Sequence, residues 1–305
     1  MAINLNNKSG AGRADWTPYL FSAPVVLYLL IFQGYPLLQE LYLSFTSTSL
    51  LSPAKHVFVG LRNYSDLVEA AEFARVLWTT FIYTVGCVVF SVSLGLGAAL
   101  LLNAPLRGRG LARSLITIPW AAPPVAVALI FVWMFNGQYG VLHQAFQWVG
   151  LSDGMEGWLN DPALALTAVL VTTVWQIFPF ASVVILSALQ GVSSELREAA
   201  VMDGADRLSV FVAVVWPTIR PTVMLLTLFV TIWSLRRFDL IWLMTQGGPI
   251  GRTNTLVIEL YRRAFTFREL GEAAAVGMVG LTTALLITIV YFWFNVRAER
   301  AAGQK

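Results

Sequence analysis

The chain has 305 residues, of which 57% are hydrophobic and only 12% are charged. Soluble domains carry about 25% charged residues, so this composition excludes an ordinary soluble protein and indicates an integral membrane protein. The net charge of +3 is small and the basic residues fall mainly in predicted loops, which argues against nucleic-acid binding.

The first apolar run covers residues 16–39 and is long enough to cross a bilayer. A cleaved signal peptide is the alternative, but its apolar region is typically about 7–15 residues long and ends in a small-residue cleavage site, which this run lacks. We therefore predict an uncleaved first span with Trp16 and Tyr19 as interfacial anchors. The polar residues 1–15 before it are predicted to form a disordered tail.

A polar stretch, residues 46–75, follows, and the acidic residues Asp66, Glu69 and Glu72 indicate a short surface helix within it. The uncharged run Val76–Leu106 predicts the second span. It contains Cys87, the only cysteine, so the chain forms no intrachain disulfide and no cysteine metal site. Its glycines suit close packing of membrane helices; they are Gly86, Gly95 and Gly97.

A basic turn, residues 107–113, leads to a third predicted span at Ser114–Phe135. Prolines near the start of this span predict kinks; they are Pro119, Pro123 and Pro124. Residues 136–161 contain no Lys or Arg and are broken by glycines. The fourth span is predicted at Pro162–Leu189.

The charged segment, residues 193–220, separates the fourth span from the fifth. We predict that the fifth span starts near Pro221 and is interrupted by charged residues at 236–239. A sixth span is predicted at Ala273–Phe294, so the membrane domain covers residues 16–296 and a basic tail covers 297–305. An even number of spans places both termini on the same side of the membrane.

The distribution of Lys and Arg predicts which side that is, because cytoplasmic loops are enriched in these residues. The termini, the basic turn and the charged segment hold Lys8, Arg13, Arg107, Arg109, Arg113, Arg197, Arg207, Arg220, Arg297, Arg300 and Lys305. The loops on the other side hold Lys55, Arg62, Arg75, Arg252, Arg262, Arg263 and Arg268. Both termini and the charged segment are therefore predicted to be cytoplasmic.

Motifs for nucleotide hydrolysis are missing from the sequence. None of the lysines, Lys8, Lys55 and Lys305, follows a glycine, so the chain has no phosphate-binding loop of the G-x-x-x-x-G-K type. The two histidines, His56 and His143, lie on separate loops without metal-ligand spacing, and we interpret both as solvated surface residues. The sequence predicts no catalytic residue, no metal site and no cofactor. An intramembrane enzyme would need a catalytic dyad, and a secondary transporter would show inverted repeats of its spans; neither is found.

The charged segment has the signals of a short exposed helix. Ser194 is predicted to cap it, and Glu195 in the first turn favours the helix N-terminus. Leu196, Ala199, Ala200 and Asp203 share one face, and Gly204 suits the helix end. The small face permits close approach of a protein, and Glu198 and Asp203 offer carboxylates to a basic partner. A helix resting on lipid headgroups is the alternative, but such helices carry Lys/Arg-rich faces.

The segment EAAVMDGADRLSVFVAVVWPTIRP, residues 198–221, resembles the cytoplasmic EAA loop of bacterial binding-protein-dependent ABC importer permeases. The residues that match the family pattern are Glu198, Ala199, Ala200, Asp203, Gly204, Ala205 and Pro217. Further similar segments are FVGLRNYSDL (58–67), IPWAAPPVAVALIFVWMFNGQYGVL (118–142), VWQIFPF (174–180) and FDLIWLMTQGGPIGRTNTLVIELYRRAF (238–265). The last of these resembles the first of the two paired permeases of carbohydrate importers.

This resemblance implies an all-α, six-span protein with the type I ABC importer permease fold in the bacterial inner membrane. The charged segment would contain a coupling helix that docks on a dimer of separate cytoplasmic ATPase subunits. A second homologous permease would complete the pathway, and an extracytoplasmic binding protein would deliver a sugar or sugar derivative. An amino acid, an anion or a polyamine is the alternative cargo.

Polar residues inside membrane spans mark transport pathways by default. We take Trp175 and Gln176 of the fourth span, together with Arg236, Arg237 and Asp239 of the fifth, as candidates for the substrate pathway. The alternative for the charged residues is a structural ion pair, or arginines that reach the outer interface. The spacing of Asp239 from the arginines is unsuited to pairing on a continuous helix, which favours roles across a cavity.

Overall fold

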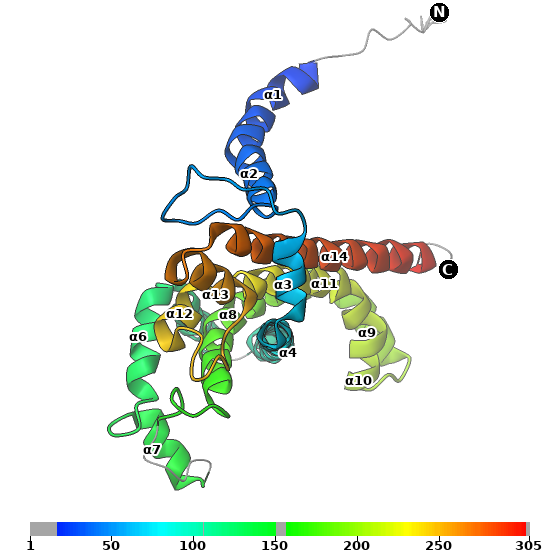
Figure 1. Cartoon of the computed structure of the whole chain (residues 1–305). Helices are drawn as coiled ribbons and strands as arrows, with labels where there is room; N and C mark the ends of the chain where they lie inside the picture. The colour runs from blue at the N-terminus through cyan, green and yellow to red at the C-terminus, as the bar shows by residue number, and fades with distance from the viewer. Residues whose placement is uncertain (1–16, 106, 151–156, 303–305) are drawn as a thin grey trace, which may run out of the picture.

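The structure, a computed structural model, describes residues 17–105, 107–150 and 157–302. These residues form α-helices and short π-helical turns, and the described ranges contain no β-strand (Figure 1). In chain order the elements are α1 (Thr17–Leu29), η1 (Leu30–Gly34), α2 (Tyr35–Leu43), α3 (Arg62–Glu69), α4 (Ala71–Asn103), α5 (Arg109–Ala121), α6 (Pro124–Met134), α7 (Val141–Trp148), α8 (Ala165–Gln190), α9 (Ser194–Met202), α10 (Arg207–Val210), η2 (Phe211–Val215), α11 (Trp216–Leu235), α12 (Asp239–Thr245), α13 (Leu256–Tyr261), η3 (Arg262–Thr266) and α14 (Leu270–Ala302). The tail predicted at residues 1–15 lies outside the described residues.

Within the described residues, five helical stretches are long and apolar enough to cross a membrane. They are Tyr19–Leu43, Ala71–Asn103, Ala165–Gln190, Arg207–Leu235 and Leu270–Asn295. The pair α5–α6 qualifies as one further span, bent by 92° between its two helices. The bend falls at Pro123 and Pro124, so the predicted kink is confirmed, and the pair completes the six predicted spans.

The fifth span begins earlier than predicted. Its helix starts at Arg207 rather than near Pro221, and η2 ends at Val215, just before Pro217. A proline has no N–H to donate and its ring collides with the carbonyl four residues earlier, here that of Ala213. In η2 the Trp216 N–H donates to the Phe211 carbonyl, five residues earlier, which makes the turn wider than an α-helical turn. This wider turn includes Ala213, whose carbonyl the ring of Pro217 would otherwise meet. The helix then ends at Leu235, before the arginines that were predicted to interrupt it.

Helices α4 and α8 form the centre of the fold, and they run in the same direction. Near their first halves Tyr83 and Cys87 share a buried cluster with Ala168 and Val169. Near their ends Ala99 packs in a second cluster with residues of the last two turns of α8. Parallel membrane helices require the chain between them to return across the bilayer, and α5–α6 provides that return.

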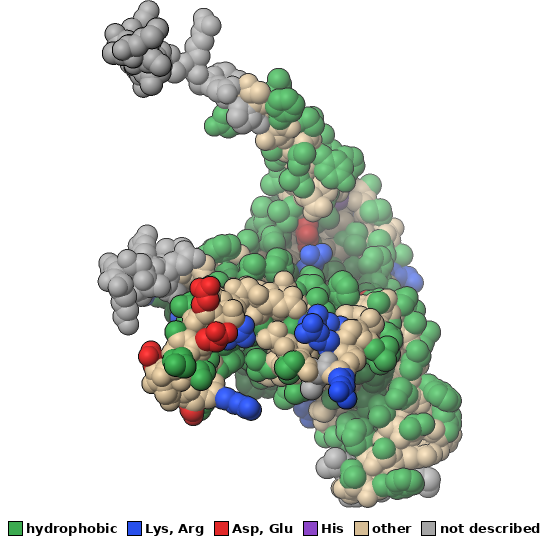
Figure 2. All heavy atoms as spheres, turned by 180° about the vertical axis from the view of Figure 1, so that it is seen from behind, with side chains coloured by type: hydrophobic (Ala, Val, Ile, Leu, Met, Phe, Trp, Pro, Cys, Tyr) green, Lys and Arg blue, Asp and Glu red, His purple; other side chains and the backbone are tan. Residues whose placement is uncertain are grey.

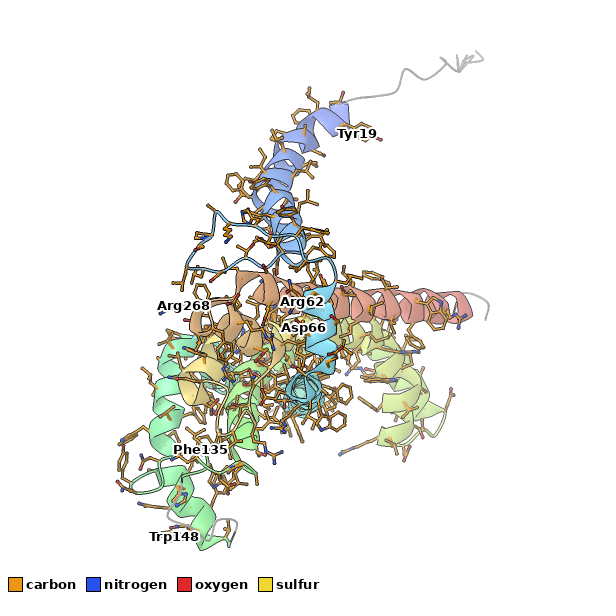
Figure 3. The ribbon with its side chains drawn as sticks, viewed as in Figure 1. Tyr19, Arg62, Asp66, Phe135, Trp148 and Arg268 are labelled. Atoms are coloured by element: carbon orange, nitrogen blue, oxygen red, sulfur yellow. The ribbon has the colours of Figure 1, made fainter. Side chains whose placement is uncertain are left out.

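The N-terminal span projects from this centre (Figure 1). Its α2 packs on α14, while α1 is exposed along its length. α14 runs across the view of Figure 1 to the C-terminus and extends to Ala302, beyond the predicted sixth span. Figure 3 shows Tyr19 on α1 and Trp148 on α7 near opposite extremes of the molecule.

Candidate coupling surface and transport cavity

The charged segment folds as a short helix, α9, and a tight turn that leads into α10, the first turn of the helix of the fifth span. The Oγ of Ser193 accepts a hydrogen bond from the Leu196 N–H at 3.4 Å and caps α9. The sequence placed this cap at Ser194, which instead starts the helix. Two consecutive serines offer the same side chain, and only the backbone conformation of Ser193 (φ −56°, ψ 129°) places its hydroxyl over the first turn.

The other end of α9 closes in a Schellman turn, as the position of Gly204 predicted. The Gly204 N–H donates to Val201 O and the Ala205 N–H donates to Ala200 O, each at 3.0 Å. Gly204 has φ +87°, a left-handed conformation that other residues adopt at a cost. A Cβ added there would meet no atom within 4 Å, so the requirement for glycine is one of backbone conformation alone.

The following helix, α10, is also capped. The Asp206 carboxylate accepts a hydrogen bond from the Ser209 N–H at 2.9 Å. Hydrogen bonds from the Ser209 side chain and backbone lower the pKa of the Asp206 carboxyl below its usual value. The cap is therefore ionised at neutral pH, and both helices are fixed by their own local contacts.

The surface of this arm, α9 with its turn and α10, is exposed. Glu198, Ala199, Asp203 and Gly204 are exposed, and Ala200 and Ala205 are half-buried. Large apolar side chains are also exposed here, namely Leu196, Val201, Leu208 and Met202, the last of them by 87%. Figure 2 shows charged side chains gathering on the protruding arm, in contrast to the hydrophobic surface of the long helices. Pro217 is separate from this surface, because it lies in α11.

The base of the arm is buried in the membrane bundle. Val192, before α9, and Val215, after α10, pack in one cluster with Leu189 of α8 and Ile219 of α11. The arm therefore leaves α8 and returns to α11 through a shared hydrophobic joint.

A cavity of about 630 Å³ lies along the same two helices. It is lined by Trp120, Ala122, Pro124, Gln176, Ile177, Trp233, Arg236, Arg237, Phe238 and Asp239. The bend between α5 and α6, the middle of α8 and the end of α11 thus meet at one space. Four of the five predicted pathway residues lie on it.

A chain of polar contacts crosses the cavity wall. Gln176, only 4% exposed, donates from Nε2 to the Ala122 carbonyl at 3.1 Å and accepts a hydrogen bond from Arg237. The Nε of Arg237 lies 3.6 Å from Oδ1 of Asp239. The expectation that Asp239 would be unsuited to pairing was wrong, because α11 ends at Leu235 and the helical spacing rule does not apply beyond it.

The aromatic residues of the cavity lining were not predicted from the sequence. Trp175 lies away from the cavity lining, with its ring against Phe131 at a centroid distance of 5.1 Å. Trp120 and Trp233 line the cavity instead, each in contact with the ring of Phe180. The sequence holds no signal that separates these two from tryptophans at membrane interfaces, since only the fold brings α5 and α11 together.

The two histidines differ from each other. His56 is exposed, as predicted, with Nδ1 3.0 Å from the Thr48 hydroxyl. His143 is buried, which corrects the prediction that it is a solvated residue, and its ring lies 3.1 Å from the Gln147 amide. It belongs to α7, whose inner face packs towards the bundle. Within the part of the chain that the structure describes, no group of three or more His, Cys, Asp or Glu residues is arranged to hold a metal ion.

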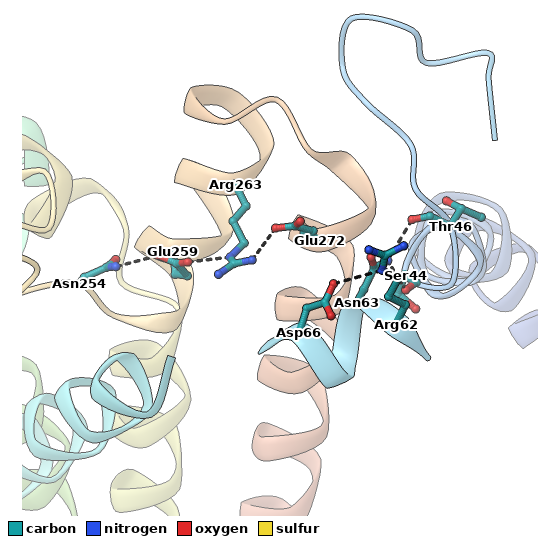
Figure 4. A network of polar contacts seen from close by, with 9 residues as sticks. All are labelled: Ser44, Thr46, Arg62, Asn63, Asp66, Asn254, Glu259, Arg263 and Glu272. Atoms are coloured by element: carbon teal, nitrogen blue, oxygen red, sulfur yellow. Dashed lines mark hydrogen bonds and ion pairs between the residues drawn. The ribbon is translucent and has the colours of Figure 1, made fainter. Parts of the chain in front are cut away.

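A buried charge network on the outer loops was not predicted (Figure 4). Arg263 donates from Nε to Glu259 at 2.7 Å and from Nη1 to Glu272 at 2.5 Å, and Asn254 donates to the other oxygen of Glu259 at 2.8 Å. The network joins α13 and η3 to the start of α14. Nearby, the Asn63 amide donates to the carbonyls of Ser44 and Thr46 and holds α3 to the end of α2.

Comparisons with known proteins agree with this architecture. Residues 91–302 match the family described as binding-protein-dependent transport system inner membrane component. The chain is 33% identical to the sulfoquinovosyl glycerol transport system permease protein SmoG of Agrobacterium fabrum, over 89% of this chain and 88% of that protein. It is also 33% identical to the trehalose/maltose transport system permease protein MalF of Thermococcus litoralis, over 90% and 91%.

Among solved structures, a chain of a bacterial ABC transporter involved in the import of the acidic polysaccharide alginate superimposes with a TM-score of 0.79. The match covers 93% of this chain and 96% of that chain at 22% identity, which shows a shared fold. The family model matches most of the chain, and the relatives and the multi-pass helical fold agree with it. The chain belongs to the binding-protein-dependent transport system inner membrane components.

Proposed function

We propose that the chain is one of two permease subunits of an ATP-driven importer and forms half of its pathway for a sugar or sugar derivative. Relatives that are 33% identical over about nine-tenths of the chain are named as permeases for sugar compounds, which supports this cargo. A separate pair of cytoplasmic ATPase subunits supplies the energy, a binding protein delivers the sugar, and a second permease closes the other half of the cavity.

The arm formed by α9 and α10 is the observation that carries this proposal. Its two caps make it rigid, while its outward face combines exposed carboxylates with exposed apolar side chains such as Met202. Such a surface suits a partner protein that can cover the apolar groups and pair with the acids. Glu198, Ala199, Ala200, Asp203, Gly204 and Ala205 are assigned to this docking surface.

A movement of the arm can change the shape of the cavity. It connects α8 to α11, and the same helices carry Gln176 and Trp233 to the cavity wall. Gln176 lies fourteen residues before Gln190, the last residue of α8, or about 21 Å at the α-helical rise. A displacement of the arm by the ATPase subunits therefore passes through the buried joint at Val192 and Val215 and shifts two walls of the cavity. In this mechanism Pro217 shapes α11 and does not touch the ATPase.

The test compares two glycines that flank α9, Gly191 before it and Gly204 after it. In Gly204→Ala the new residue must hold φ +87°, which costs about 1–2 kcal/mol and shifts the equilibrium constant against the docking conformation roughly 5–30-fold. The control, Gly191→Ala, has φ −81° and a nearest contact of 3.4 Å, so it keeps the arm intact. We expect substrate-stimulated ATP hydrolysis and uptake by the assembled importer to fall in the first variant only.

Further variants sharpen this test. Gly204→Asp is expected to abolish uptake while membrane insertion is retained, and Glu198→Gln to weaken copurification with the ATPase subunits. Wild-type uptake and ATP hydrolysis in both Gly204 variants would remove the arm from the coupling mechanism. At the cavity, unchanged substrate affinity and uptake in Gln176→Ala and Arg237→Ala would remove these residues from the pathway.

A further inference from the structure

The cavity has an excess of positive charge. Of its lining residues, Arg236 and Arg237 are cationic and Asp239 is the only acid. These charges lie where a membrane span ends, so they are partly shielded from water and act on one another and on a ligand more strongly than they would in bulk solvent.

The two arginines have different surroundings. The side chain of Arg237 is 17% exposed, donates to Gln176 and lies beside Asp239. Asp239 therefore offsets its charge within the cavity wall, and the hydrogen bond to Gln176 holds the guanidinium from one side, while the buried Nε makes no hydrogen bond. Arg237 positions the wall.

Arg236 is the uncompensated cation. It is exposed to the cavity, and the part of the chain that the structure describes places no carboxylate within ion-pairing distance of its guanidinium. It follows the last residue of α11, so it extends from the helix end, three residues after Trp233. The guanidinium fork matches the oxygens of carboxylate, sulfate and phosphate groups, and such charge-assisted bonds are about twice as strong as neutral ones.

Apolar surfaces lie beside this cation. Trp233 is 39% exposed and Trp120 is 50% exposed, and both line the same cavity. Indole faces suit the C–H surface of a sugar ring, because they bury a large apolar area at a small cost in side-chain entropy. The cavity therefore offers an aromatic platform and one free guanidinium to the same ligand.

We propose that this cavity selects acidic saccharides, with Arg236 binding the anionic group of the substrate and the tryptophans contacting its ring. The inference rests on the proposed function, because it assigns the substrate class of the transport cavity. Asp239 sets the strength of selection, since it neutralises Arg237 and leaves the cavity with one net positive charge. A neutral sugar can contact the same tryptophans but cannot form an ion pair with Arg236.

The experiment uses the assembled importer in nanodiscs and a matched set of probes. Methyl β-D-glucoside is compared with its 6-carboxyl, 6-sulfate and 6-phosphate counterparts by titration calorimetry. We expect at least one charged probe to bind about tenfold to a hundredfold more tightly than the neutral probe, which is the range of a charge-assisted hydrogen bond. Raising the ionic strength is expected to reduce this preference.

Three variants test the assignment of the cation. Arg236→Gln is expected to abolish the preference, because it lowers the affinity for the charged probes far more than the affinity for the neutral probe. Arg252→Gln, the control, removes an exposed charge from an outer loop and is expected to change neither affinity. Asp239→Asn frees Arg237 and is expected to strengthen binding of the charged probes severalfold.

Three results would overturn the inference. The first is equal or tighter binding of the neutral probe, and the second is no binding of any charged probe. The third is an equal loss of affinity for all probes in Arg236→Gln, which would indicate that Arg236 holds the wall or faces lipid phosphates. ATP-driven uptake in proteoliposomes with the binding protein separates the two proposals. Uptake of a neutral saccharide would preserve the proposed function when the charge preference fails, whereas the absence of uptake of any saccharide would refute both.

Discussion

At the scale of single residues, close packing of membrane helices depends on where each glycine points. A Cβ on Gly95 would lie 2.6 Å from the Cβ of Ala181 and 3.1 Å from its carbonyl carbon, while a Cβ on Gly97 would meet no atom within 4 Å. Gly86 faces Leu170, with a contact of 2.8 Å to a flexible side chain. The prediction of close packing is confirmed for Gly86 and Gly95 and is wrong for Gly97, which faces outwards.

This difference gives a matched pair of substitutions two residues apart. Gly95→Ala must push α4 away from the backbone of α8 and is expected to destabilise the protein by about 1–3 kcal/mol, as overpacking does. Gly97→Ala is expected to be neutral or to stabilise by up to about 1 kcal/mol, because alanine favours the helix. Thermal unfolding of the purified protein in detergent distinguishes them. Equal melting temperatures for the two variants would show that α4 and α8 do not pack at Gly95.

At the scale of elements, the outer loops are held together by the ion network of Figure 4. The side chains of Arg263 and Glu259 are 17% and 10% exposed, and Glu272 is more open. Removing the arginine leaves a buried carboxylate without its partner, and breaking a buried pair costs about 3–5 kcal/mol. We expect the loss of unfolding free energy in Arg263→Met to lie at or below the lower end of this range, because the Glu272 carboxylate can become hydrated again.

The neighbouring Arg262 provides the control for this variant. Its guanidinium lies over the Phe267 ring at 5.6 Å, an exposed contact worth about 0.5–1 kcal/mol. Arg262→Met should therefore lower the melting temperature far less than Arg263→Met. Restoration of stability in the double variant Arg263→Met, Glu259→Gln would confirm that the unpaired carboxylate is the cause. A similar small loss in both single variants would show that the network does not hold α13 to α14.

Elements that depend on local patterns were predictable from the sequence, and those that depend on tertiary contacts were not. The charges at Asp66 and Glu69 indicated α3, and Gly204 indicated the end of α9, because both signals act within one or two turns. The start of the fifth span was misplaced, since prolines usually begin helices and a π-helical turn that admits Pro217 has no sequence signature. The Arg263 network and the tryptophans of the cavity join segments far apart in the chain, so no local pattern contains them.

At the scale of the whole molecule, the direction of α4 and α8 decides the topology. Both helices run the same way through the core, so residues between them must cross the membrane once more. The bent pair α5–α6 is then a true span and the chain crosses six times. If α5–α6 were a re-entrant loop, every segment after it would lie on the opposite side from that given by the positive-inside rule.

Single-cysteine labelling in intact cells separates these two topologies. The only native thiol, Cys87, is fully buried, so the wild-type protein is expected to remain unlabelled by a membrane-impermeant maleimide. Trp148→Cys on α7 and Met202→Cys on α9 place thiols at positions that are 91% and 87% exposed. With six spans and a cytoplasmic charged segment, the thiol at 148 reacts in intact cells and the thiol at 202 reacts only after permeabilisation. The reverse pattern would assign α9 to the outer face, where no ATPase can reach it, and would refute the coupling role of the arm.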